Sequence, residues 1–134
     1  MNTTELLMKI DKKKFDEIPT IQYKSDALSE IAGEDVILTL KATDSAELIK
    51  LSKKASDNDE EKQLEAMKLI CIKGIVDPDL KSVELKEAFG LDAKATPLDL
   101  ISKIWGVRQL ELIEIAKEIM KLNGLKTETD DIKK

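Results

Sequence analysis

The chain changes from a strand pattern to a helix pattern within VILTLKATDSAELIKLSKKAS, residues 36–56. Residues 36–41 are β-branched or leucine at most positions, which favours a strand. Asp44 is followed three residues later by Glu47, a spacing typical of a helix N-terminus, where such side chains accept hydrogen bonds from free amides. We therefore predict a strand over 36–41 and a helix that begins at Asp44 and ends near Ser56.

Upstream of this segment, residues 21–24 alternate between apolar and polar side chains, which predicts a second short strand. Residues 25–32 form too long a connection for a tight hairpin and have room for a helical turn. Residues 1–20 mix charged and apolar side chains and end near Pro19. We expect a short helix near Thr4–Ile10 and then an extended linker, because the residue before a proline disfavours helix.

Downstream, residues that favour helix caps recur at regular intervals. They predict helices from Asp57–Glu61 to about Ile75, from Ser82 to Phe89, from Thr96-Pro97 to Trp105, and from Val107 to Leu122. The predicted fold is mainly α (α+β), a helical bundle of about five helices with a small N-terminal two-stranded β element. We expect a flexible N-terminal segment over 1–20, a single domain over 21–124 and a mobile polar tail over 125–134.

The residue types that support catalysis are scarce. The chain has no histidine, which removes the usual general base, and its one cysteine, Cys71, has no partner for a disulfide or a zinc site. The five glycines are isolated, so no phosphate-binding loop is present in the sequence. Glu111, Glu114 and Glu118 share one face of the last predicted helix, which we interpret as a solvated surface and not a metal site. We expect a protein without enzymatic activity, cofactor or metal, with Cys71 in the core.

Charge and hydropathy exclude two classes of partner. The net charge is −5, Arg108 is the single arginine, and aromatic residues make up 3%, so the chain offers little to phosphates or stacked bases. No apolar run approaches the length of about 18 residues that a membrane helix requires. The N-terminus lacks the pattern of a secretory signal. We expect no contact with nucleic acid or membrane, and a reducing cytosol as the compartment.

The apolar positions of the last predicted helix cover about half of its circumference at 100° per residue. Burial in the core explains an arc of this width, and so does a protein interface. The candidate partner-binding residues are Met67, Trp105, Leu110, Ile113, Ile119 and Met120. Each of them can also be a core residue, because apolar residues at helical spacing usually face inward.

Four segments in this order and spacing resemble a known family. They are VILTLKA (36–42), IVDPDL (75–80), LKEAFG (85–90) and IMKLNG (119–124). The chain resembles the XkdN-like tail assembly chaperones of contractile-tailed bacteriophages and phage-tail-like particles. The resemblance covers about two thirds of the chain and depends on short turn motifs joined by variable helices.

The resemblance implies a function and a set of partners. A protein of this family binds the tape-measure protein in the host cytoplasm, keeps it soluble, and is displaced as tail tube subunits polymerise, so it is absent from the mature particle. Further implied partners are the tail tube protein and a longer, frameshifted form of the chaperone, for which Lys133-Lys134 offers a slippery site. A homo-oligomer is compatible with the wide apolar arc. The alternative is a structural minor tail protein or a small helical adaptor that forms a permanent oligomer.

Overall fold

The structure, a computed structural model of the chain, describes residues 2–125. This part of the chain contains seven α-helices, two 3₁₀ helices and three β-strands. In chain order they are α1 (Thr3–Lys9), η1 (Lys12–Asp16), β1 (Thr20–Lys24), α2 (Asp26–Ala32), β2 (Ile37–Lys41), α3 (Ser45–Ala55), α4 (Glu60–Gly74), β3 (Ile75–Asp77), α5 (Val83–Ala88), α6 (Pro97–Trp105), η2 (Gly106–Arg108) and α7 (Glu111–Leu122).

The three strands form an antiparallel sheet in the order β1-β2-β3. In the β1–β2 pair, Thr20 lies opposite Lys41 and Lys24 lies opposite Ile37. Side chains of β2 alternate between the two faces, so Leu38 and Leu40 are buried while Ile37 is exposed. The two strands that the sequence predicted are therefore confirmed.

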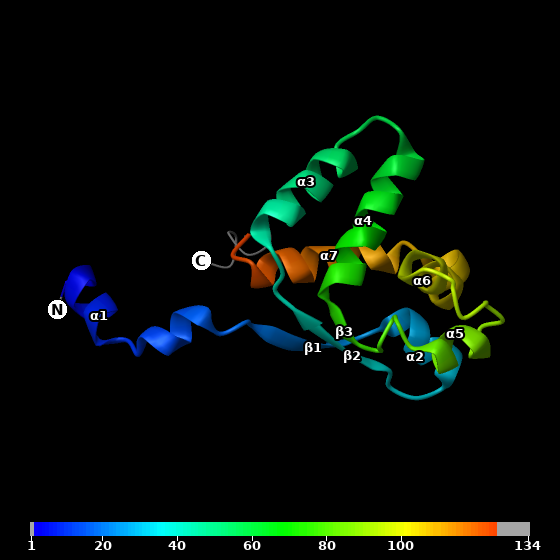
Figure 1. Cartoon of the computed structure of the whole chain (residues 1–134), viewed down its shortest axis with the longest axis horizontal. Helices are drawn as coiled ribbons and strands as arrows, with labels where there is room; N and C mark the ends of the chain where they lie inside the picture. The colour runs from blue at the N-terminus through cyan, green and yellow to red at the C-terminus, as the bar shows by residue number, and fades with distance from the viewer. Residues whose placement is uncertain (1, 126–134) are drawn as a thin grey trace.

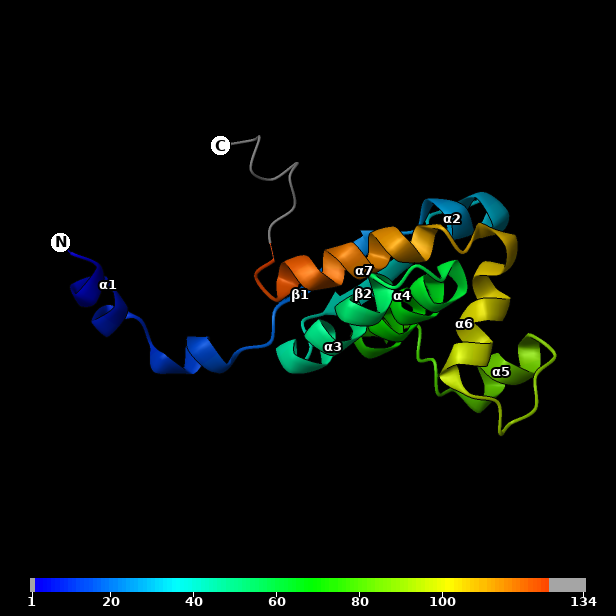
Figure 2. The ribbon, with the colours of Figure 1, turned by 90° about the horizontal axis from the view of Figure 1, so that it is seen from above.

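Helices α3 and α4 form a hairpin that rises from the sheet, and α4 also packs against α6 and α7 (Figure 1). Helix α7 contacts β2, while α5 and α6 lie at the opposite end of the molecule from the N-terminal residues (Figure 2). The core is built mainly of aliphatic side chains around one tryptophan. Its buried members are Leu38, Leu40, Leu48, Leu51, Ile70, Cys71, Ile75, Leu80, Leu100, Ile101, Trp105, Leu112, Ile115, Ala116 and Ile119. The predicted core position of Cys71 is confirmed.

The predicted helix starts are confirmed at the level of the cap hydrogen bonds. The Asp44 carboxylate accepts from the first free amides of α3, and the Ser82 hydroxyl accepts from an amide of α5. Thr96 and Asp99 form a reciprocal capping box at the start of α6. Local sequence determines these features because each cap involves residues only two or three positions apart.

The third strand contradicts the prediction of a two-stranded element. Residues 75–77 follow α4 directly and pair with β2, where we expected the end of a helix and a turn. Leu40 lies opposite Ile75, and Thr39 lies opposite Asp77. A strand of three residues is too short to show alternation, and its partner lies more than thirty positions away along the chain. No local signal in the sequence could reveal it.

The expected number of helices and the expected start of the last one were also wrong. The described residues contain seven α-helices and not about five. Of the two outside the predicted bundle, α1 matches the short helix predicted near Thr4–Ile10, and α2 lies in the connection 25–32, where the sequence left room for a helical turn. The class, mainly α with a small sheet, is confirmed. Helix α7 begins at Glu111 and not at Val107, because Gly106 has a φ of 52° and the chain turns through η2 before α7. The predicted polar tail lies outside the described residues, except for Leu125.

Candidate protein-binding groove

A groove of about 570 Å³ lies between α3 and the C-terminal end of α7. We call it the α3/α7 groove. It is lined by Ser45, Leu48, Ile49, Ser52, Lys53, Ser56, Met120, Asn123, Gly124 and Leu125. Of these, Leu48 is buried, whereas Ile49 and Leu125 are exposed. The groove thus presents an apolar surface about as long as α3.

Small side chains on α3 create the space for this groove. At 100° per residue, Ser45, Ser52 and Ser56 project into the same arc of about 100° as Leu48 and Ile49. The Ser56 hydroxyl donates to the carbonyl of Ser52 at 3.2 Å, and the Ser52 hydroxyl lies 3.7 Å from the Met120 sulfur. These hydroxyls have partners within the protein, so a bound apolar segment does not leave them unsatisfied.

The side-chain amide of Asn123 connects the two walls of the groove. Its Oδ1 accepts from the amide of Thr43 at 2.9 Å, and its Nδ2 donates to the Thr43 carbonyl and to the Ser45 hydroxyl. Asn123 thereby pairs with the Thr43 backbone as a neighbouring strand would. The start of α3 and the end of α7 are held together at this point by hydrogen bonds as well as by packing.

The chemistry of the groove suits binding. Among the described residues that line it, Lys53 is the one with an ionisable side chain. General acid–base catalysis and metal binding both need ionisable or ligating groups that converge on a substrate, and such a set does not meet in this groove. Within residues 2–125, no three acidic or cysteine side chains are close enough together to hold a metal ion.

A second polar cluster corrects the interpretation of the last helix. Glu111 is not on a solvated face: its carboxylate accepts hydrogen bonds from the Ser25 hydroxyl, from the amide of Ala27 at 2.9 Å and from Trp105 Nε1 at 2.8 Å. These bonds connect α2, α6 and α7. Burial, and then the nearby Glu111 carboxylate, raises the pKa of the Tyr23 phenol above its ordinary value. Tyr23 is partly buried and packs against the hydrophobic core.

The six predicted partner-binding residues occupy different environments. Met120 lines the groove, and Leu110 is 75% exposed between η2 and α7. Met67 and Ile113 are partly buried. Trp105 and Ile119 lie in the core and offer almost no surface in this conformation. The structure does not bring the six together into one surface, and their role in partner binding stays a prediction.

The sequence reasoning missed Ile49 and the serines beside it. A signal was present, because Ile49 is an apolar residue outside the core stripe of its helix, with serines three positions after it and four before it. The pairing of this face with Met120 and Leu125 could not be predicted, since it depends on the tertiary contact between α3 and α7.

Within residues 2–125, every helix is too short or too polar to span a membrane. Comparison with curated proteins gives no match. Among solved structures, the chain is similar to the crystal structure of the protein yqbn, with a TM-score of 0.51 and 18% sequence identity over 82% of this chain and 90% of that chain. At this identity the likeness concerns the fold.

The family comparison covers almost the whole chain. The model for the phage XkdN-like tail assembly chaperone protein matches residues 4–134. This match confirms the resemblance drawn from the four short segments, and it extends over the N-terminal region and the groove as well. The family is one of assembly chaperones and not of enzymes. The chain therefore belongs to the XkdN-like family of phage tail assembly chaperones.

Proposed function

We propose that this chaperone binds helical segments of the tape-measure protein in the α3/α7 groove and keeps that protein soluble until tail tube subunits polymerise around it. Family membership supports a role in tail assembly. The observation that carries the binding step is the groove itself, with an apolar lining and hydroxyls that are already hydrogen-bonded. Amphipathic helices commonly bind in grooves of this kind.

The dimensions of the groove support a short helix as the proposed occupant. The eleven residues of α3 span about 16 Å at 1.5 Å per residue, which corresponds to about three helical turns. A helix of that length presents apolar side chains at positions i, i+3 or i+4, and i+7. Lys53 at the edge of the groove favours an acidic residue on the polar side of the bound helix.

The size of the groove also suits release. A contact with three turns of helix is smaller than the roughly 1,600 Å² that is standard for stable complexes. Each copy therefore binds weakly, and a long tape-measure protein is covered by many copies that leave one after another as the tube grows. This order of events needs no enzymatic step. Under this proposal the chaperone acts in the host cytoplasm and is absent from the mature particle.

Two further partners follow from the same proposal. The tail tube protein displaces the chaperone, and a longer form of the chaperone arises by frameshifting at the codons for Lys133-Lys134, which lie outside the described residues. A gene without a slippery heptamer at these codons would exclude the longer form.

The test is co-expression of the tape-measure protein with chaperone variants, followed by measurement of the soluble tape-measure fraction. Ile49→Asp places a charge in the groove, and Ile31→Asp on α2 is a matched control because the two isoleucines are 58% and 57% exposed. We expect the wild type and Ile31→Asp to keep the tape-measure protein soluble and Ile49→Asp to fail. Equal solubility with both variants would contradict the proposal.

A second measurement separates the chaperone from a structural component. Mass spectrometry of purified particles is expected to find no copies of this chain. Stoichiometric copies in the particles would instead support the minor tail protein or permanent adaptor.

A further inference from the structure

Residues 2–19 form an N-terminal arm that projects from the end of the molecule where α3 begins and α7 ends (Figures 1 and 2). No residue of this arm is buried. Its large apolar side chains are 38–71% exposed, and they are Leu6, Leu7, Met8, Ile10, Phe15 and Ile18. The body of the protein leaves this apolar surface uncovered.

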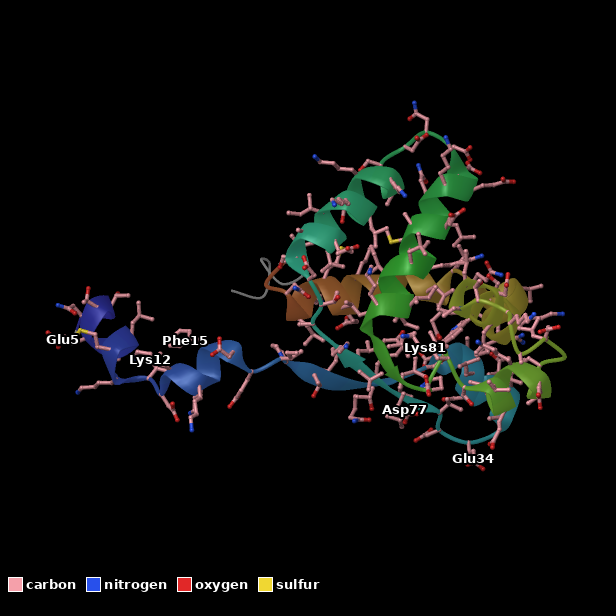
Figure 3. All side chains as sticks on the ribbon, in the orientation of Figure 1. Glu5, Lys12, Phe15, Glu34, Asp77 and Lys81 are labelled. Carbon is pink, nitrogen blue, oxygen red and sulfur yellow. The ribbon has the colours of Figure 1, made fainter. Side chains whose placement is uncertain are left out.

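The arm satisfies its own polar groups. Asn2 caps α1, and the Lys12 ammonium donates to three carbonyls at the C-terminal end of α1 at 2.7–3.0 Å. Asp11 caps η1 in the same way, and Lys12 lies 6.0 Å from the centre of the Phe15 ring. Figure 3 shows Glu5, Lys12 and Phe15 on the arm, far from the body. The apolar side chains are therefore the feature of the arm that still requires a partner.

The arm joins the body of the protein beside the α3/α7 groove. The Pro19 carbonyl accepts from the amide of Ala42 at 2.9 Å, and the next residue, Thr43, bonds to Asn123 in the wall of the groove. An uncovered apolar segment and an open apolar groove thus lie at the same end of the molecule.

The connection between arm and body directs the arm away from its own groove. Only residues 17–19 separate η1 from β1. The pyrrolidine ring fixes φ of Pro19, and it restricts Ile18 to extended conformations. A reversal of the chain that would return α1 to the groove of the same molecule is therefore disfavoured. The groove of a second molecule can receive the arm without such a reversal.

We propose that the arm docks in the α3/α7 groove of a second copy of this chain. Because each arm joins its body beside the groove of the same chain, two copies can exchange arms around a twofold axis and fill both grooves at once. The inference goes beyond the proposed function and does not depend on it. Where both hold, a tape-measure segment must displace the arm of the second copy.

The test begins with sedimentation of the full chain over a range of concentrations. We expect a dimer of twice the 15.0 kDa protomer mass. Met8→Asp in the arm and Ile49→Asp in the groove should each raise the dimer dissociation constant at least about tenfold, because each places a charge in the apolar contact. Val107→Asp is the control: Val107 is 95% exposed, lies outside arm and groove, and should leave the dimer intact.

Disulfide trapping then identifies the contact. Cys71 is buried, so Met8→Cys and Ile49→Cys each add one accessible thiol. Mixing the two variants under oxidising conditions should give a covalent dimer that contains one chain of each. A monomeric wild type at every concentration, a dimer that survives Met8→Asp, or a disulfide confined to one chain of the Met8→Cys/Ile49→Cys double variant would each overturn the proposal. Because Met8 lies outside the groove, loss of the dimer in Met8→Asp with tape-measure solubility retained separates this inference from the proposed function.

Discussion

Gly74 lies where α4 crosses α7, and its replacement by alanine tests the packing of these helices directly. A Cβ atom at this position would lie 2.4, 2.6 and 2.8 Å from Cδ1, Cγ1 and Cγ2 of Ile119. Carbon atoms in contact are normally about 3.5–4.0 Å apart. Ile119 is fully buried and β-branched, so no single rotation of its side chain removes all three contacts.

Two opposing effects decide the outcome of Gly74→Ala. In a helix, alanine is favoured over glycine by up to about 1 kcal/mol. Overpacking a buried site costs about 1–3 kcal/mol, and here three atoms are compressed by about 1 Å. Because three atoms are compressed at once, we take the upper end of that range, about 3 kcal/mol, and expect a net loss of about 2 kcal/mol in the free energy of unfolding. This corresponds to a decrease of roughly 7 °C in the melting temperature for a chain of this size.

Circular dichroism during thermal and urea unfolding measures this loss. Ile119→Ala removes the three contacting atoms, so Gly74→Ala should cost little or nothing in that background, with a coupling energy of about 2–3 kcal/mol in the double-mutant cycle. A Gly74→Ala variant as stable as the wild type, or an equal cost in both backgrounds, would refute the packing described for α4 and α7.

Three other predictions concern ionisable residues. Glu111→Gln turns one acceptor of the Glu111 cluster into a donor and should lower the free energy of unfolding by about 2 kcal/mol in urea titrations, whereas the exposed Glu114→Gln should change it by less than about 0.5 kcal/mol. Burial raises the pKa of the Cys71 thiol, so a thiol reagent near pH 8 should label the native protein more than about a hundredfold slower than the unfolded chain, and equal rates would contradict its burial. Hydrogen bonds from the backbone and side chain of Thr96 lower the pKa of Asp99 from its ordinary value of 3.8, so the stabilisation by these bonds is present above pH 3.8 and is lost as the pH falls further. The difference in melting temperature between the wild type and Asp99→Asn should therefore shrink below pH 3.8. A difference that stays constant with pH would argue against the capping box.

The features that could be predicted from the sequence depend on local chemistry, and the features that could not depend on tertiary contacts. Asp44, Ser82 and Thr96 each cap a helix through amides two or three residues away, and the sequence predicted all three. The same holds for the alternation of β1 and for the β-branched and leucine residues of β2. These features depend on neighbours along the chain, so one sequence contains enough information to place them.

Contacts between distant segments account for what was missed. Glu111 looked like one carboxylate of a solvated face, because Ser25 lies 86 positions earlier in the chain and no periodicity connects the two. In the sequence Gly74 is one of five isolated glycines, and its close contact with Ile119 arises only from the packing of α4 on α7. The groove forms only where α3 lies beside α7. Met120 could therefore be predicted as a partner-binding residue from its helix face, but its position next to Ile49 could not be predicted.

The amide of Asn123 has a consequence for how this surface can diverge. Because one side chain offers the donor and the acceptor that Thr43 and Ser45 require, the hydrogen-bonded contact between the start of α3 and the end of α7 depends on a side chain with a single methylene group. Asn123→Asp would lose the donor, and Asn123→Leu would fill the volume and lose both. Asn123→Gln would keep both groups and move them outward by one carbon–carbon bond. Substitution at this one position would therefore change the contact between the two helix ends while the core beneath it stays unchanged.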